Sequence, residues 1–254
     1  MSSRYFGLFA NARISPWLLR LLIRFYVKIF RIDLSEYDFN LQEITTFNAF
    51  FTRKLLSGTR TWERGICSPV DGRVMSVGSL EKGKLFQVKG VDYTLEDLVG
   101  IKVLDRGSFI NLYLSPADYH RVHAPMDMTI ESITHIPGKL LSVSSKNAKF
   151  VKGLYTGNER VILSGKNKLG RFYFVFVGAL NVGSIALSFF PELKTNLWKD
   201  KTKNFDHFFE IKKGEELGWF EMGSTIIFIL ESDHFKDNPL VKEQDVVRLG
   251  KALA

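Results

Sequence analysis

Cysteine is nearly absent from this chain of 254 residues, since Cys67 stands alone. One cysteine can form neither a disulfide framework nor a cysteine-rich zinc site, and it fits a reducing compartment. The sequence also has no run of about 20 apolar residues, the length that a helix needs to cross a bilayer. No segment resembles a cleavable secretory signal, a low-complexity tract or a solenoid repeat. These absences argue against a disulfide-stabilised secreted module, a helical membrane span and a repeat protein.

Acidic residues are outnumbered, with 27 Asp and Glu against 35 Lys and Arg, so the net charge is +8. Such a charge favours an anionic partner, which could be nucleic acid, acidic lipid or a charged substrate. The apolar fraction of 45% is ordinary for a globular protein, although Phe is unusually common, with 22 residues. The length fits one large domain, or one domain with an appendage.

The first feature that is present is an amphipathic stretch from Trp17 to Ile32. Ser15 and Pro16 predict its start, with Ser15 as N-cap and Pro16 at the first helical position. Four cations interrupt the apolar residues at helical spacing and form one stripe: Arg20, Arg24, Lys28 and Arg31. Such a helix suits a membrane interface, with its cations near lipid phosphates. The alternative is a helix that packs on the domain and exposes a basic edge. Nucleic acid is not favoured, because no recognition motif follows.

The rest of the chain divides near residue 60. A second helix is predicted from Leu41 to Leu55, followed by a polar joint at residues 57–60. A short helix is predicted at Leu95 to Val99 and a polar loop at Lys194 to His207. Short stretches rich in β-branched and aromatic residues predict the strands: Val70 to Val77, Lys84 to Val88, Phe109 to Leu114, Met128 to Ile136, Arg160 to Leu163, Arg171 to Phe176, Gly183 to Phe189 and Thr225 to Leu230.

We therefore predict an α+β protein. Its helical, membrane-facing segment covers residues 1–60, and a predominantly antiparallel, β-rich catalytic domain covers residues 61–254.

Three stretches hold residues that could carry chemistry. Asp71 lies in an Asp-Gly turn that enters a strand, and a turn former is its simpler interpretation. His120 and His123 lie between two prolines, and they could be ordinary loop histidines. Their His-x-x-His spacing lacks the i, i+4 pattern and the glutamate of helical zinc motifs, so no metal is predicted. Gly223-Ser224 precedes an apolar strand, where glycine leaves its carbonyl open to a neighbouring hydroxyl.

An Asp, a His and a Ser in separate turns are the components of a nucleophilic triad. Their sequence context resembles the phosphatidylserine decarboxylases over roughly Phe47 to Leu230. The motifs that carry this resemblance are Ser68-Pro-Val-Asp-Gly-Arg-Val74, Tyr119-His-Arg-Val-His123 and Met222-Gly-Ser-Thr225, supported by Phe50-Phe-Thr-Arg-Lys-Leu55, Asn158-Glu-Arg-Val161 and Val182-Gly-Ser-Ile185. Met222 departs from the Leu that is usual in the family, and the two side chains are nearly isosteric.

The resemblance implies that the chain processes itself. His123, oriented by Asp71, would act as base on the Ser224 hydroxyl, which attacks the carbonyl of Gly223. Cleavage between residues 223 and 224 would yield a larger β and a smaller α subunit. Ser224 would become a covalent pyruvoyl group, the cofactor that forms a Schiff base with the substrate amine.

The resemblance also implies the reaction and its setting. The substrate would be phosphatidylserine, the products phosphatidylethanolamine and CO2, and His120 the proton donor. The protein would bind the anionic cytoplasmic face of the cell membrane peripherally and would need neither metal nor nucleic acid. A homo-oligomer is compatible with this setting.

Three alternatives stay open from the sequence. Ser-Pro-Val-Asp-Gly-x-Val also opens strands in lipoyl-type and phosphotransferase carrier domains, where His123 would carry a phosphoryl group. A membrane-bound scaffold that has lost processing would be expected to lack Asp71, His123 or Ser224, and all three are present. A decarboxylase of another serine-headgroup lipid is the closest rival.

Overall fold

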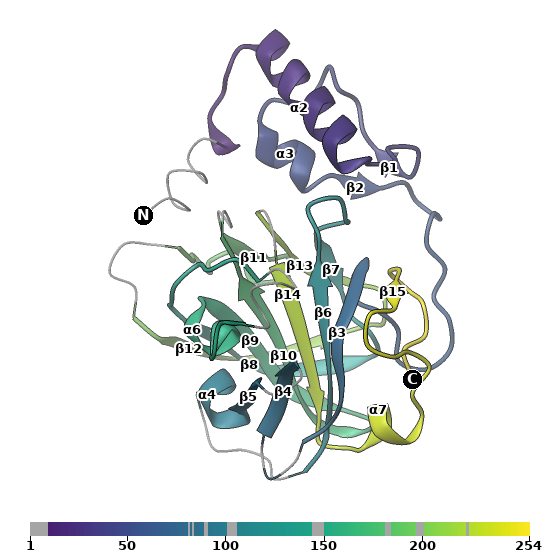
Figure 1. Cartoon of the computed structure of the whole chain (residues 1–254), viewed down its shortest axis with the longest axis vertical. Helices are drawn as coiled ribbons and strands as arrows, with labels where there is room; N and C mark the ends of the chain where they lie inside the picture. Colours follow the sequence, from purple (N-terminus) through teal and green to yellow (C-terminus); the bar gives the residue numbers. More distant parts are fainter. Residues whose placement is uncertain are drawn as a thin grey trace.

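The computed structural model describes residues 10–80, 82, 84–88, 91–100, 106–143, 150–180, 184–196, 201–221 and 224–254. A β-rich body carries a smaller helical part at one end (Figure 1). The predicted α+β class is confirmed. Among the described residues, no helix combines the length and the apolar character needed to cross a membrane.

An antiparallel sheet of eight strands forms the centre of the body, in the order β12-β8-β9-β10-β14-β6-β3-β15. The strands are β3 (Gly72–Ser79), β6 (Ser108–Leu114), β8 (Met128–Ile136), β9 (Arg160–Asn167), β10 (Gly170–Gly178), β12 (Lys203–Ile211), β14 (Ser224–Leu230) and β15 (Val246–Val247). Strand β14 pairs with β10 on one side and β6 on the other, and all its residues are buried. Burial of both faces explains why its sequence is apolar without alternation.

A smaller sheet, ordered β11-β13-β7, packs against this one. Its strands are β7 (Arg121–His123), β11 (Ile185–Leu187) and β13 (Glu216–Phe220). Val122 and Phe220 belong to the main core, together with Phe176 and Phe228 of the large sheet. Since side chains alternate along a strand, Arg121 and Trp219 point away from this core.

The other face of the large sheet packs against a second apolar cluster, which includes Tyr155, Tyr173 and Ile227. The elements with residues in this cluster are β5 (Val91–Thr94), α4 (Leu95–Val99) and α6 (Leu154–Gly157), and β5 pairs with β4 (Lys84–Val88). Thr94 and Asp97 form a capping box that starts α4. A last short helix, α7 (His234–Asp237), follows β14.

The helical part contains α2 (Pro16–Phe30), α3 (Phe47–Phe51) and the paired strands β1 (Tyr37–Asp38) and β2 (Lys54–Leu55). Helix α2 begins at Pro16, as predicted, and Ser15 occupies the N-cap position without a side-chain capping bond. Leu19 and Ile23 of α2 pack against Phe50 of α3.

Two predicted segments were wrong. The helix predicted from Leu41 to Leu55 is limited to Phe47–Phe51, because Thr46 caps it by accepting a hydrogen bond from the Ala49 amide, and Lys54 and Leu55 pair with β1 instead. The loop predicted from Lys194 to His207 contains the start of β12 at Lys203. This strand lies at the edge of the sheet, where one side is exposed and polar residues are tolerated.

Candidate active site

Ser224 is the first residue of β14 and lies between Leu114 of β6 and Gly178 of β10. Its side chain is fully buried, and its Oγ has no hydrogen-bond partner among the described residues. Buried hydroxyls are usually paired, and those of Ser224 and Thr225 are both exceptions, of which only Ser224 directly follows the predicted cleavage bond. Met222 and Gly223 lie outside the described residues, so the structure describes the predicted cleavage bond only on its Ser224 side.

Three segments that are distant in sequence meet at this end of the sheet. Strand β6 ends at Leu114 beside the start of β14, and β3 begins at Gly72 beside the same end of β6. Asp71 therefore lies one residue before β3, and the loop that carries His120 follows β6. This end of the sheet faces the helical part of the molecule (Figure 1).

His120 is fully buried and contacts the ring of Phe51, with 4.0 Å between the ring centroids. Its Nδ1 lies 2.8 Å from the carbonyl oxygen of Asp118, so we assign the proton to Nδ1. Its Nε2 is buried without a partner in the described part of the chain. Burial lowers the pKa of His120 to about 3, opposed by the hydrogen bond to Asp118 and aided by the Arg53 guanidinium. The ring is therefore neutral at physiological pH, with a free lone pair on Nε2.

His123 has both ring nitrogens occupied. Nδ1 lies 2.8 Å from the carbonyl oxygen of Gly214, and Nε2 lies 3.1 Å from the hydroxyl of Tyr119. Burial lowers the pKa of His123 and raises that of Tyr119, so both groups are neutral. The ring of His123 therefore donates a hydrogen bond from Nδ1 to the Gly214 carbonyl and accepts one at Nε2 from the Tyr119 hydroxyl. The base predicted from the sequence is thus held in one tautomer, and its lone pair is engaged.

Asp71 also has both carboxylate oxygens engaged. Oδ1 accepts the Leu249 amide at 2.7 Å, and Oδ2 accepts Arg60 Nη2 at 2.9 Å. Arg60 also forms an ion pair with Glu36 of the helical part, with 2.8 Å between Nη1 and Oε1. The hydrogen bonds described for Asp71 and His123 therefore go to other residues and not to each other. Their roles in a triad stay a prediction.

Three residues of this region had no predicted role: Tyr119, Arg60 and Asn158. The Asn158 Nδ2 donates to the carbonyl oxygens of Leu141 and Gly178, each at 2.8 Å. Since Gly178 is the pairing partner of Ser224, Asn158 fixes the strand beside the candidate nucleophile. The sequence signal for Asn158 was the motif Asn158-Glu-Arg-Val161, because its burial is known only from the fold.

Comparison with known proteins gives one consistent result. Residues 47–254 match the family model described as phosphatidylserine decarboxylase. A relative from Idiomarina loihiensis is 36% identical over 99% of this chain and 91% of its own length. Relatives from Campylobacter jejuni and Helicobacter pylori are 38% and 39% identical, over 100% and 99% of this chain and 97% and 95% of their own lengths. All three are named phosphatidylserine decarboxylase proenzyme.

Proposed function

This chain belongs to the phosphatidylserine decarboxylase family, and we propose that it converts phosphatidylserine to phosphatidylethanolamine and CO2 after cutting itself between Gly223 and Ser224. The two products of the cut are residues 1–223 and residues 224–254. The name proenzyme, shared by the relatives, supports such a maturation step.

The observation that carries the proposal is the buried, unpaired hydroxyl of Ser224. A pyruvoyl group made from Ser224 would occupy the same buried position, held by strands on both sides. When present, the group supplies a ketone that binds the substrate amine and accepts the electrons released as CO2 leaves. The residues around Ser224 therefore fit the cofactor that the family resemblance implies.

His123 and Asp71 have the maturation roles in this proposal. To accept the Ser224 proton, Nε2 of His123 must exchange the Tyr119 hydroxyl for Oγ, while the bond to Gly214 retains the correct tautomer. Apo hydrogen bonds of catalytic groups commonly rearrange in this way before reaction. Asp71 would act on His123 through its charge, which favours the protonated ring, because Nδ1 stays bonded to Gly214.

His120 has the proton-transfer role in decarboxylation. Its Nε2 is unpaired among the described residues, and a bound substrate carboxylate would raise the low pKa of His120. This nitrogen could then hold the proton that the substrate ammonium must lose before it acts as a nucleophile. The same nitrogen can then return the proton to the substrate carbon that loses CO2. A phosphocarrier role for His123 is not favoured, because residues 47–254 match the decarboxylase family and the relatives are named as its proenzymes.

The purified protein tests this proposal directly. We expect the active material to contain two fragments that end at residue 223 and begin at position 224. Borohydride should reduce a carbonyl on the smaller fragment and abolish decarboxylation of phosphatidylserine. Intact-mass spectrometry before and after borohydride measures both. A single unbroken chain with full activity would contradict the proposal.

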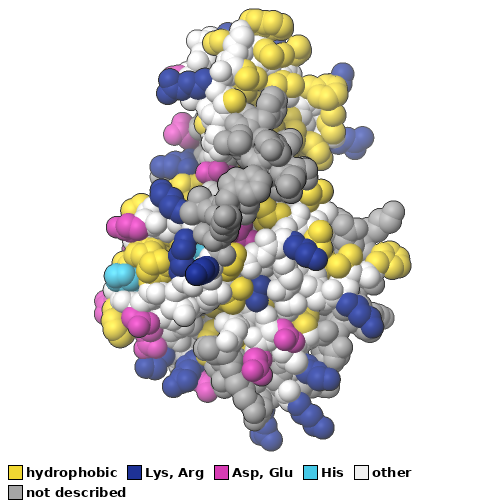
Figure 2. Space-filling model, turned by 90° about the vertical axis from the view of Figure 1, so that its left-hand side faces the viewer, with side chains coloured by type: hydrophobic (Ala, Val, Ile, Leu, Met, Phe, Trp, Pro, Cys, Tyr) yellow, Lys and Arg dark blue, Asp and Glu magenta, His cyan; other side chains and the backbone are white. Residues whose placement is uncertain are grey.

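The helical part is proposed to bind the cytoplasmic face of the membrane peripherally, and we retain residues 1–60 as this segment. Helix α2 buries Leu19 and Ile23 but exposes a row of large apolar side chains, and Figure 2 shows apolar side chains gathered over this end of the molecule. The exposed row consists of Trp17, Leu21, Phe25 and Ile29. Trp17 and Phe25 are 68% and 63% exposed, which is a large apolar surface for a helix facing water.

The apolar row should determine vesicle binding. Inserting one Leu or Phe side chain into lipid contributes up to about 1.5–3 kcal/mol. A variant with Leu21→Gln and Phe25→Gln should therefore bind anionic vesicles at least about tenfold more weakly in a sedimentation assay. The matched control is Phe208→Gln with Leu240→Gln, which removes two exposed apolar residues from the β-rich body. Equal losses in both variants would refute a specific role for α2.

A further inference from the structure

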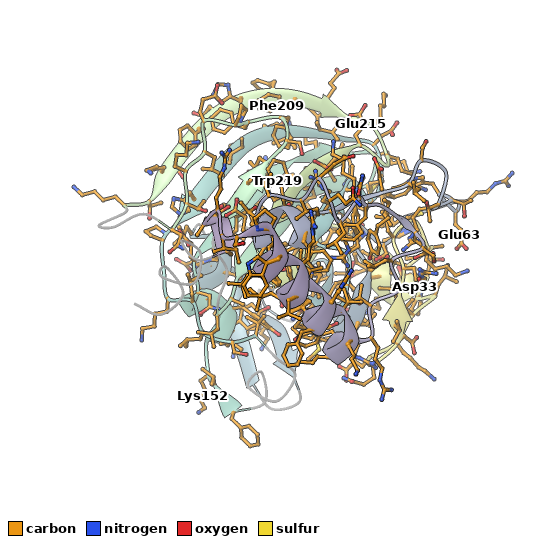
Figure 3. All side chains as sticks on the ribbon, turned by 90° about the horizontal axis from the view of Figure 1, so that it is seen from above. Asp33, Glu63, Lys152, Phe209, Glu215 and Trp219 are labelled. Atoms are coloured by element: carbon orange, nitrogen blue, oxygen red, sulfur yellow. The ribbon has the colours of Figure 1, made fainter. Side chains whose placement is uncertain are left out.

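A cavity of about 610 Å³ lies on the outer face of the three-stranded sheet. Ala186, Trp219 and Arg121 are successive neighbours across this sheet and form the cavity floor. Ser224 shares its face of the large sheet with Ile226 and Phe228, which belong to the main core on the other side of the three-stranded sheet. The cavity is therefore separate from the Ser224 side chain. Trp219 is labelled in Figure 3, which looks onto the helical end of the molecule.

One ion pair forms a fixed wall of the cavity. The Nη1 of Arg121 lies 2.9 and 2.8 Å from the two carboxylate oxygens of Glu216, and its Nε donates to the carbonyl of Thr52 at 2.8 Å. The guanidinium also lies 5.1 Å from the ring centre of Trp219. Because Arg121 and Glu216 neutralise each other, they add rigidity but little net charge.

Three further charged residues line the cavity: Lys54, Lys194 and Glu221. Both lysines are exposed, and neither has a carboxylate within ion-pair distance in the described part of the chain. Glu221 accepts one long hydrogen bond, at 3.4 Å from Asn11 Nδ2. Within the described residues, the cavity thus offers two cations without an ion-pair partner and one carboxylate beside an aromatic floor.

We propose that this cavity captures the headgroup of phosphatidylserine, an inference that rests on the proposed function. The headgroup carries a phosphodiester, a carboxylate and an ammonium group. The two anions match Lys54 and Lys194, and the ammonium matches Glu221. A volume of 610 Å³ lies within the range of about 300–1,000 Å³ that is usual for small-molecule sites.

The location of the cavity supports a capture role. Lys54 belongs to β2 of the helical part, which is the part proposed to meet the membrane. Glu221 lies three residues before Ser224 in the chain. A headgroup held here is therefore near both the bilayer and the processed chain end. Because bond breaking takes place elsewhere, the cavity should affect substrate capture and not the chemical step.

Kinetics of the mature enzyme on phosphatidylserine in mixed micelles separate these two effects. A variant with Lys54→Gln and Lys194→Gln should raise KM about tenfold and leave kcat within twofold. The matched control is Lys168→Gln with Lys236→Gln, two exposed lysines remote from the cavity, which removes the same charge. Equal KM values in the two variants would overturn the proposal.

A soluble headgroup removes the membrane surface from the measurement. The uncut Ser224→Ala protein should bind glycerophosphoserine more tightly than glycerophosphoethanolamine, which lacks the carboxylate. Glycerophosphocholine should bind weakest, because its ammonium has no N–H to donate to Glu221. Adding the two lysine substitutions should weaken glycerophosphoserine binding at least tenfold in calorimetry. No saturable binding, or the same affinity in both proteins, would also overturn the proposal.

These results are distinguishable from a failure of the proposed function. Wild-type protein that is neither cut nor active on phosphatidylserine would contradict the function itself. Wild-type protein that is cut and active, with unchanged kinetics in the lysine variant, would contradict only the capture site.

Discussion

A Ser224→Ala variant should remain one chain of 29.1 kDa and show no decarboxylation of phosphatidylserine. The substitution removes one buried oxygen that has no partner in the described structure, so it should leave the fold intact. Without that oxygen, nothing at position 224 can attack the carbonyl of residue 223. Intact mass and circular dichroism measure the processing and the fold independently.

Thr225→Val is the matched control for this variant. The Thr225 hydroxyl is also buried and unpaired within the described residues, but strand alternation directs it to the opposite face of the sheet. The control should therefore be cut at the normal rate. Cleavage of the Ser224→Ala chain at the same bond, or failure of the Thr225→Val chain to be cut, would refute the assignment of the nucleophile.

The same mass assay ranks the two groups proposed to activate Ser224. His123→Ala and Asp71→Asn should each slow cleavage by about 10²-fold or more, the usual contribution of a positioned base. Tyr119→Phe should cut at least as fast as the wild type, because it frees Nε2 of His123. Slow cleavage in Tyr119→Phe would show that this hydroxyl takes part in maturation.

The second large effect is expected at His120. A His120→Gln variant should still cut itself, but its kcat for phosphatidylserine should fall by about 10²–10⁴-fold, because Nε2 would no longer transfer the proton. Fragment masses and CO2 release measure the two steps. His207→Gln, which changes an exposed histidine of β12, is the control and should keep full activity. Normal turnover in His120→Gln would remove the proposed role.

The buried His120 also predicts a pH dependence of stability. Its folded pKa of about 3 lies below the unfolded value of about 6.5, so the unfolded chain binds more protons between these values. The stability that His120 contributes is therefore present above pH 6.5 and is lost as the pH falls toward 3. In the uncut Ser224→Ala background, His120→Gln should reduce this acid sensitivity in thermal melts.

Local sequence signals predicted the elements whose burial is uniform. Pro16 fixed the start of α2, and the apolar run after Ser224 predicted β14, because both signals depend on neighbouring residues alone. Strand β12 escaped prediction because Lys203, Asp206 and Glu210 are tolerated at an edge that faces solvent. The long second helix was predicted in error because Leu41, Ile44 and Phe47 recur at helical spacing, although the helix begins only after the Thr46 cap.

The candidate site was only partly accessible from sequence. Resemblance identified Asp71, His120, His123 and Ser224, and the structure gathers their segments at one end of the sheet. The hydrogen-bond partners of Asp71 and His123 could not be predicted. Asp71 and Leu249 are joined across 178 positions, and His123 and Gly214 across 91. Such contacts depend on the complete fold and leave no local pattern.

The position of β14 determines what a cut before Ser224 can do to the protein. This strand is hydrogen-bonded along both edges and buried throughout, and the same fragment supplies the Leu249 amide that holds Asp71. Separating the fragments would remove a central strand from the eight-stranded sheet and expose the apolar core of the protein to water. Cleavage before Ser224 should therefore leave two polypeptides that stay associated on dilution. The new chain end at position 224 should be held as firmly as an internal residue.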